Sequence, residues 1–168
     1  NEDNGADVEL YFLQLVGTTF YTVARVANTS ISFYRKTTVN AAFSEVATVA
    51  DETAGSTPRG FVAFPDSVGV EDLFLGTNAG LYWHDISASV SRRVHTFRDP
   101  GSAGTGILRV GNSRIWFVDG DSIGYGEWAD SSWDPTYIEG PVEGVPTANT
   151  GAITAMELST RKPWVYVL

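Results

Sequence analysis

A strand–turn–strand pattern repeats along this chain, and the repeat constrains the fold more than any other feature. Residues 73–85 (LFLGTNAGLYWHD) align without a gap on residues 115–127 (IWFVDGDSIGYGE), an offset of 42 residues (115 − 73). Each copy has an apolar run, a polar turn containing Gly and a second apolar run. Residues 23–35 have the same form 50 residues before the first of these copies. Residues 164–168 begin a last, partial copy, in which Trp164 corresponds to Trp116.

The composition of these runs predicts β-strands rather than helices. The runs are rich in Val, Ile, Phe, Tyr, Trp and Thr, and they are bounded by Gly, Asn, Asp or Pro. A spacing of roughly 40 to 50 residues with four strands per unit is typical of β-propeller blades. We therefore expect an all-β, β-propeller-like fold of four-stranded antiparallel blades, with a large β-sandwich as the alternative.

We expect one domain over residues 1–168, built from successive blade units. The units are expected near residues 8–50, 60–97, 106–138 and 152–168. Within them we expect strands at 8–16, 19–27, 30–37, 43–50, 60–65, 72–77, 80–86, 92–97, 106–110, 114–119, 122–128, 136–138, 152–157 and 163–168. About 3.5 blades form an incomplete ring, since closed propellers have about four to eight. An open sheet edge accepts another strand, so we expect another copy, a partner chain or further polypeptide to complete it.

The charge balance excludes several classes of partner. The chain has 20 acidic and 11 basic residues, a formal net charge of −9, and no cysteine. Affinity for phosphate comes from clustered Lys and Arg, so we expect neither direct nucleic-acid binding nor docking on an anionic membrane. No apolar run approaches the roughly 20 residues that span a bilayer. Without cysteine the chain has no disulfide, no thiolate nucleophile and no zinc–thiolate site.

The residues that could carry catalysis form no recognisable motif. His84 and His95 titrate nearest to neutral pH, but no Ser in a nucleophile-elbow context accompanies them. Residues 119–122 (DGDS) offer oxygen ligands for calcium, but without the full calcium-loop pattern we interpret them as a polar hairpin turn. Some carboxylates could pair across a sugar cleft, although spacing singles none out. These are Asp85, Glu127, Asp130 and Asp134. We expect no enzymatic activity, no metal and no cofactor.

A cluster of aromatic and acidic residues is the candidate binding site. It comprises Trp128, Asp130, Trp133, Asp134 and Tyr137. Flat rings stacked on sugar faces, with neighbouring carboxylates binding hydroxyl groups, would form a carbohydrate site. The alternative is that these rings fill the wedge between neighbouring blades, because aromatic side chains carry a large apolar area.

The order of segments in the third and fourth units resembles a known family. The segments SRIWFV (113–118), IGYGE (123–127) and SSWDP (131–135) follow one another, and a link containing Gly and Pro leads to ITAME (153–157) and WVYVL (164–168). This order resembles propeller units of bacteriophage tail proteins. In those units a strand, a turn and a second strand are followed by Ser-x-Trp-Asp and then by an apolar strand pair.

Two earlier segments, VGTTFY (16–21) and LGTNAGLY (75–82), also resemble the Gly-x-x-Leu-Tyr hairpins of these tail proteins. The resemblance implies a virion structural component near the tail tip, nozzle or hub, built as a symmetric ring of copies. Our leading expectation is a non-enzymatic structural or adhesion module of a viral or extracellular assembly, which contacts proteins through strand edges and blade faces. The alternatives are a secreted carbohydrate-binding propeller and, third, a propeller glycoside hydrolase.

Overall fold

The computed structural model describes residues 8–26, 30–49, 56–66, 68–129, 132–138, 153–158 and 165–167. These residues form strands, turns and connecting segments, and they contain no helix. The strands form three four-stranded antiparallel sheets and a further sheet of two strands, none of them closed into a barrel. The predicted all-β fold with repeated four-stranded sheets is therefore confirmed.

Each sheet is a meander in which consecutive strands are neighbours. We call the four-stranded sheets blades 1 to 3 and the two-stranded sheet unit 4. Blade 1 contains β1 (Val8–Val16), β2 (Thr19–Val26), β3 (Ile31–Lys36) and β4 (Ser44–Thr48). Blade 2 contains β5 (Pro58–Pro65), β6 (Glu71–Thr77), β7 (Gly80–Asp85) and β8 (Val90–Thr96). Blade 3 contains β9 (Leu108–Gly111), β10 (Arg114–Asp119), β11 (Ser122–Ala129) and β12 (Ser132–Tyr137). Unit 4 contains β13 (Met156–Leu158) and β14 (Val165–Val167).

Most expected strands agree with these bounds to within two residues, but two differ more. The sequence predicts the last strand of blade 3 at 136–138, whereas β12 covers Ser132–Tyr137, so that prediction was wrong in extent. Pro135 lies inside this strand. Because β12 is an edge strand, proline is tolerated there without breaking the ladder between two strands. Of the strand expected at 152–157, residue 152 lies outside the described residues, residues 153–155 are not in a strand, and β13 begins at Met156.

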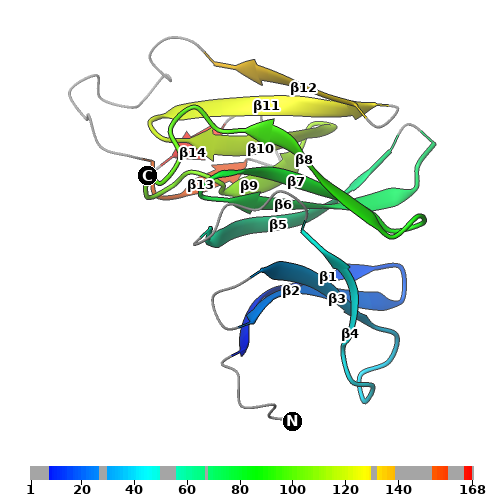
Figure 1. The fold of residues 1–168 in the computed structure, drawn as a ribbon. Coiled ribbons are helices and arrows are strands. Elements are labelled where there is room, and N and C mark those ends of the chain that lie inside the picture. Colours follow the sequence, from blue (N-terminus) through cyan, green and yellow to red (C-terminus); the bar gives the residue numbers. More distant parts are fainter. Residues whose placement is uncertain are drawn as a thin grey trace.

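The three blades stack face to face in chain order, with blade 1 (blue to cyan) at the bottom of the view in Figure 1 and blade 3 (yellow-green to gold) at the top. The first strands form a row, because β1 contacts β5, β5 contacts β9 and β9 contacts β13. The fourth strands also meet, since β8 contacts both β4 and β12. Blades 2 and 3 therefore each present one face to the preceding sheet and one to the following sheet.

An apolar core lies between each pair of neighbouring sheets. Blades 1 and 2 enclose Tyr21, Val23, Ile31, Phe33, Val49, Phe61, Leu73, Leu75 and Tyr82. Blades 2 and 3 enclose Phe64, Phe74, Leu81, Trp83, Phe97, Leu108, Ile115, Phe117 and Trp128. Blade 3 and unit 4 enclose Trp116, Val118, Ile123, Ile153 and Met156. Since successive strand residues point to opposite faces, one central strand supplies side chains to two cores.

The hairpin between the second and third strands is one residue longer in blade 1 than in blade 2. Ala24 pairs with Ser32, eight residues on, whereas Leu75 pairs with Tyr82, seven residues on. The sequence alignment superimposes Val23 on Leu73, and both side chains lie in the core between blades 1 and 2. Val23 therefore lies on the face of blade 1 that meets the following sheet, whereas Leu73 lies on the face of blade 2 that meets the preceding sheet. A shift of one residue moves a strand side chain to the other face. Ala24 is therefore the structural equivalent of Leu75, one position away from the sequence alignment.

Backbone contacts set the spacing between blades 2 and 3. Gly76 of β6 lies against Gly106, and a Cβ atom on Gly76 would overlap the Gly106 carbonyl oxygen. Gly60 of β5 is equally close to the next blade, because a Cβ atom there would overlap the backbone nitrogen of Leu108. Gly106 has a φ of 94°, which residues with a side chain rarely adopt.

Candidate functional site

The predicted aromatic site lies at the interface between blades 2 and 3. Trp128, near the end of β11, is only 5% exposed. Its ring contacts Phe74 edge-on, with 5.2 Å between ring centroids, and Trp83 at 4.9 Å. Both partners belong to blade 2, so Trp128 fills the wedge between the two sheets. Stacking of this ring on a sugar would require the two blades to separate.

The other members of this predicted site lie on different faces. Trp133 is half-buried and lies directly opposite Trp128 in the β11–β12 ladder. The indole N–H groups of both tryptophans have no hydrogen-bond partner among the described residues. Asp134 follows Trp133 in an extended strand, so its exposed side chain lies on the opposite face of blade 3. Asp130 lies outside the described residues. The structure therefore does not bring Asp134 to the tryptophan face.

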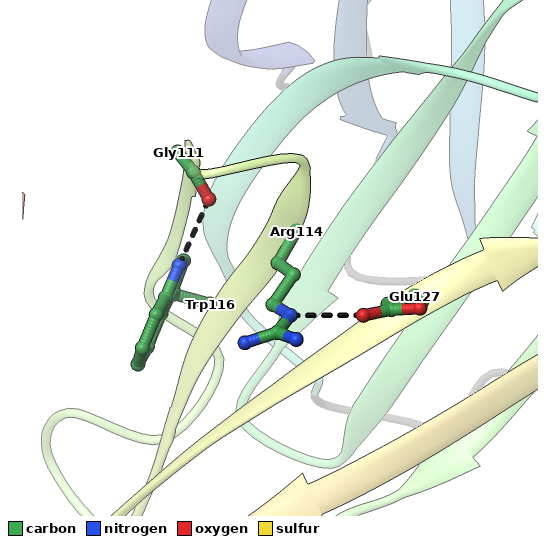
Figure 2. A network of polar contacts seen from close by, with 4 residues as sticks. All are labelled: Gly111, Arg114, Trp116 and Glu127. Carbon is green, nitrogen blue, oxygen red and sulfur yellow. Dashed lines mark hydrogen bonds and ion pairs between the residues drawn. The ribbon is translucent and has the colours of Figure 1, made fainter. Parts of the chain in front are cut away.

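Glu127 lies on the same face as Asp134 and directly opposite it, and it forms an ion pair with Arg114 (Figure 2). The Arg114 Nε atom donates to Glu127 Oε1 at 3.0 Å. Figure 2 also shows the indole N–H of Trp116 donating to the Gly111 carbonyl oxygen at 3.0 Å. Exposed ion pairs of this kind contribute at most about 1 kcal/mol. The Glu127 carboxylate is thus paired with the Arg114 guanidinium on the surface of blade 3.

Asp119, at the end of β10, joins the link that follows blade 2 to blade 3. Its side chain is buried, and Oδ2 accepts hydrogen bonds from the backbone N–H of Arg98 at 2.7 Å and from the hydroxyl of Tyr137 at 2.6 Å. Oδ1 accepts from the backbone N–H of Asp99 at 2.9 Å. These donors occupy the oxygens that a calcium ion would need. In the described part of the chain, no group of three His, Cys, Asp or Glu side chains is placed to hold a metal ion.

Tyr137 and His95 extend the same network across the interface. Because the Tyr137 hydroxyl donates to Asp119, the His95 Nε2 atom, 2.9 Å from that hydroxyl, is its donor. The Arg98 guanidinium lies 3.4 Å from the centroid of the Tyr137 ring. Burial, with a further contribution from the bond to Asp119, raises the pKa of Tyr137. Burial also lowers the pKa of His95, with Asp119 opposing the shift and Arg98 adding to it.

His84 of β7 lies at the other interface of blade 2, against blade 1. It is fully buried, and its ring stacks on Phe33 with 4.7 Å between centroids and 17° between planes. Its Nδ1 atom lies 2.9 Å from the Ser91 hydroxyl. Burial lowers the pKa of His84 to about 4, although the Asp85 carboxylate opposes this shift and Arg35 adds to it. At neutral pH His84 is therefore an uncharged packing residue.

Asp85 holds the turn between β7 and β8. Its Oδ1 atom accepts hydrogen bonds from the backbone N–H groups of Ser87 at 2.7 Å and Ala88 at 2.8 Å, and from the Ser87 hydroxyl at 2.6 Å. Burial alone would raise the pKa of Asp85, but these bonds lower it. A carboxylate that bonds the backbone two and three residues ahead stabilises a tight turn.

A further surface, on β1, is not among the sites predicted from the sequence. Leu10 is 63% exposed, Leu13 63% and Leu15 53%. These leucines pair with Ala24, Thr22 and Phe20, and a register shift between Leu10 and Leu13 keeps all three on one side of the sheet. That side points away from blade 2, because the alternate residues of β2 face the core between blades 1 and 2. We call Leu10, Leu13 and Leu15 the β1 face.

The sequence does carry a signal for the β1 face. A strand with one buried face alternates apolar and polar residues, but residues 10–16 (LYFLQLV) are apolar at most positions. Phe12 accounts for the buried side of this strand, because its ring lies 6.4 Å from that of Phe61 in blade 2. The leucines on the other side have no such partner sheet among the described residues.

Geometry separates the candidate residues into two kinds. Asp119, His84, His95 and Trp128 are engaged in packing between blades, whereas the β1 face is exposed apolar surface. Within the described ranges, no helix is long and apolar enough to cross a membrane. Comparisons of the chain with protein-family models, with curated proteins and with solved structures found no match.

Proposed function

We propose that this chain is a non-enzymatic structural or adhesion module of a viral (phage tail) or extracellular assembly, which contacts other proteins through its blade faces and strand edges. The observation that supports this proposal is the β1 face, where three large aliphatic side chains are each more than half exposed on one strand. Single exposed apolar residues are common on soluble proteins. A row of them on one face of a sheet is characteristic of a contact surface.

Covering the β1 face would release a useful amount of free energy. Full burial of one leucine side chain contributes about 1.5–3 kcal/mol, so three leucines that are a little more than half exposed contribute roughly 3–5 kcal/mol. Association also costs translational and rotational entropy, so a stable contact must extend beyond the three leucines. On the same side of blade 1, Thr22 is 3% exposed and Ser32 5%, so the exposed contact surface is centred on β1.

The buried titratable groups support a structural role rather than a catalytic one. His84 stacks on Phe33 of the preceding blade, and His95 bonds Tyr137 of the following blade. The Asp119 carboxylate accepts hydrogen bonds from two backbone N–H groups and one hydroxyl group. Each group is thus committed to joining two sheets.

Two features of the sequence support the viral setting within this proposal. The order of segments over residues 113–168 resembles propeller units of phage tail proteins. The net charge of −9 keeps an assembly soluble and repels a polyanion such as DNA that passes close to it.

Hydroxyl-radical footprinting tests this proposal. The chain would be labelled once as a purified protein and once in the native assembly isolated from the cells or particles that contain it. We expect protection of Leu10, Leu13 and Leu15 in the complex, while Val90, which is 51% exposed on the outer strand of blade 2, stays labelled. Equal labelling of the leucines in both samples would contradict the proposal. So would turnover of a glycoside that is lost in Glu127→Gln or Asp134→Asn.

A further inference from the structure

We propose that the β1 face binds a second copy of this chain head to tail, with unit 4 of one copy packed on blade 1 of the next. This inference rests on the proposed structural function and names its partner. The observation behind it is that the β1 face occupies a position that is covered by a neighbouring sheet everywhere else in the repeat.

The first strands of the three blades carry an apolar residue at the same position. Leu10 of β1, Phe61 of β5 and Leu108 of β9 each pair with the equivalent residue of the second strand. The pairs are Leu10–Ala24, Phe61–Leu75 and Leu108–Phe117. Phe61 is 8% exposed and Leu108 is 0% exposed, whereas Leu10 is 63% exposed. The three blades share an apolar residue at this position, and only its burial differs.

The molecule itself shows which surface covers this position. The Phe61 ring lies 6.0 Å from Phe33 and 6.4 Å from Phe12, both from blade 1. Leu108 packs in the core to which blade 2 contributes Phe64 and Phe74. In both cases the residue is covered by the sheet that comes before it in the chain: blade 1 covers Phe61, and blade 2 covers Leu108. A surface of the same construction is therefore the expected occupant of the β1 face.

A second copy would supply unit 4, whose strand β13 is the last in the row of first strands among the described residues. The first strands form the contact row β1, β5, β9 and β13, and β13 of one copy beside β1 of another continues this row. Head-to-tail contacts of this kind form a ring when the rotation between copies closes. Pairing the β1 face with itself would not continue the row.

The contact that a second copy can make on this side of blade 1 is confined to the first strand. On the second and third strands the side chains of this side are already buried within the chain, since Thr22 is 3% exposed, Ala24 1% and Ser32 5%. The row of first strands is therefore the part of blade 1 that a second copy would extend.

Cysteine cross-linking tests the arrangement directly, because the native chain has no cysteine. One variant carries Leu13→Cys on the β1 face, and the other carries Glu157→Cys on β13, where the side chain is exposed. We expect a disulfide-linked heterodimer when the two variants are mixed under mild oxidation. Each variant alone should give much less covalent dimer.

Sedimentation of the full chain provides the second measurement. We expect the wild type to form a dimer and Leu13→Glu to weaken that dimer at least about tenfold, because a carboxylate is costly to bury without a partner. Val90→Glu is the matched control, since it places the same charge on an exposed valine of blade 2, and it should leave the dimer unchanged. Circular dichroism would show that both variants keep their strands.

Three results would overturn the inference. They are a wild type that sediments as a single chain at every concentration, a Leu13→Cys variant that cross-links only to itself, and a Leu13→Glu variant that dimerises as tightly as the wild type. Protection of the β1 face in the native complex, without self-association of the pure chain, would leave the proposed function standing. It would show that the occupant is a different protein or further polypeptide rather than a second copy.

Discussion

The two interfaces of blade 2 solve the same structural problem with different chemistry. Where the link from blade 1 enters blade 2, the Asn78 side chain accepts from the backbone N–H of Thr57 at 2.7 Å, and the Asn78 N–H donates to the Thr57 carbonyl oxygen at 3.1 Å. Where the next link enters blade 3, the buried Asp119 carboxylate accepts from the backbone N–H groups of Arg98 and Asp99. A neutral amide fastens the first link, and a carboxylate fastens the second.

The two histidines show the same contrast. His84 packs flat on Phe33 at the interface with blade 1, whereas His95 belongs to the Tyr137–Asp119 network at the interface with blade 3. The first interface therefore depends mainly on apolar packing, and the second adds hydrogen bonds to the buried Asp119 side chain. In a buried environment such bonds are strong when complete, and a missing partner is costly. The two interfaces should respond differently to truncation, to loss of a polar group and to acid.

Truncation of the apolar interface should have the largest effect. Phe33 is fully buried between blades 1 and 2, so Phe33→Ala removes its contacts with Phe61 and His84 and leaves a cavity. We expect the free energy of unfolding to fall by about 3–5 kcal/mol, measured by urea denaturation. The control Phe12→Ala, at a side chain that is 38% exposed, should cost less than half as much. A loss below about 1 kcal/mol for Phe33→Ala would show that blade 1 does not depend on this core.

Removal of the carboxylate at the second interface should have the next largest effect. Asp119→Ala leaves the N–H groups of Arg98 and Asp99 and the Tyr137 hydroxyl without their acceptor. We expect a loss of about 2–4 kcal/mol in urea denaturation. Asp121→Ala alters an exposed carboxylate in the same turn and should stay within about 0.5 kcal/mol of the wild type. Equal effects of the two substitutions would disprove the anchoring role of Asp119.

Acid should weaken the interface with blade 1 through His84. Its folded pKa of about 4 lies below the ordinary value of 6.5, so the unfolded chain takes up the proton first. The stability that neutral His84 contributes is therefore complete above pH 6.5 and is lost as the pH falls toward 4. We expect roughly 2–3 kcal/mol of pH-dependent loss from this group.

Comparing the pH dependence of unfolding in histidine variants separates the contribution of His84 from that of the carboxylates, which also take up protons at low pH. Urea unfolding of the wild type, His84→Gln and His95→Gln would be measured between about pH 7 and pH 4.5, the range in which His84 loses its contribution. His84→Gln should flatten the profile more than His95→Gln, because His84 is fully buried and its pKa is lowered to about 4, whereas His95 is only partly buried. Identical profiles for the wild type and His84→Gln would refute the assignment.

The smallest expected effect is that of a single hydroxyl group. Tyr137→Phe keeps the ring but removes the bonds to Asp119 and His95, for an expected loss of about 1 kcal/mol. A double-mutant cycle with Asp119→Ala should give a coupling energy of at least about 0.5 kcal/mol, since the two groups bond directly. Strictly additive effects would mean that the network does not act as a unit.

The strands could be predicted from the sequence because their signals are local. Short apolar runs and the turns at Asn78 and Gly120 define hairpins without any knowledge of the remaining fold. The extent of β12 could not be predicted in this way, because Pro135 is tolerated only as a consequence of the strand lying at a sheet edge. The relation between blades 1 and 2 was off by one residue, since pattern matching does not detect a hairpin that is one residue longer.

The polar network and the β1 face depend on contacts between distant residues. Asp119 bonds the backbone of Arg98, 21 residues earlier, and His95 reaches Tyr137 across 42 residues. The sequence marks Asp119 as a turn residue, and nothing near it indicates that both oxygens are buried and bonded. The leucines of β1 look like ordinary strand residues until the stacking of the sheets shows that their side of the strand points away from blade 2.

The glycine contact between blades 2 and 3 has a consequence for how this protein tolerates change. Since peptide groups touch at Gly76 and Gly106, the distance between these sheets is a property of the main chain and not of the side chains beside it. Aromatic residues nearby can be exchanged for others of similar volume while the pitch of the stack stays constant. A methyl group added at Gly76 would overlap the Gly106 carbonyl oxygen and force blades 2 and 3 apart at this point. The change in the angle between these two blades would shift the position of blade 3 relative to blade 1.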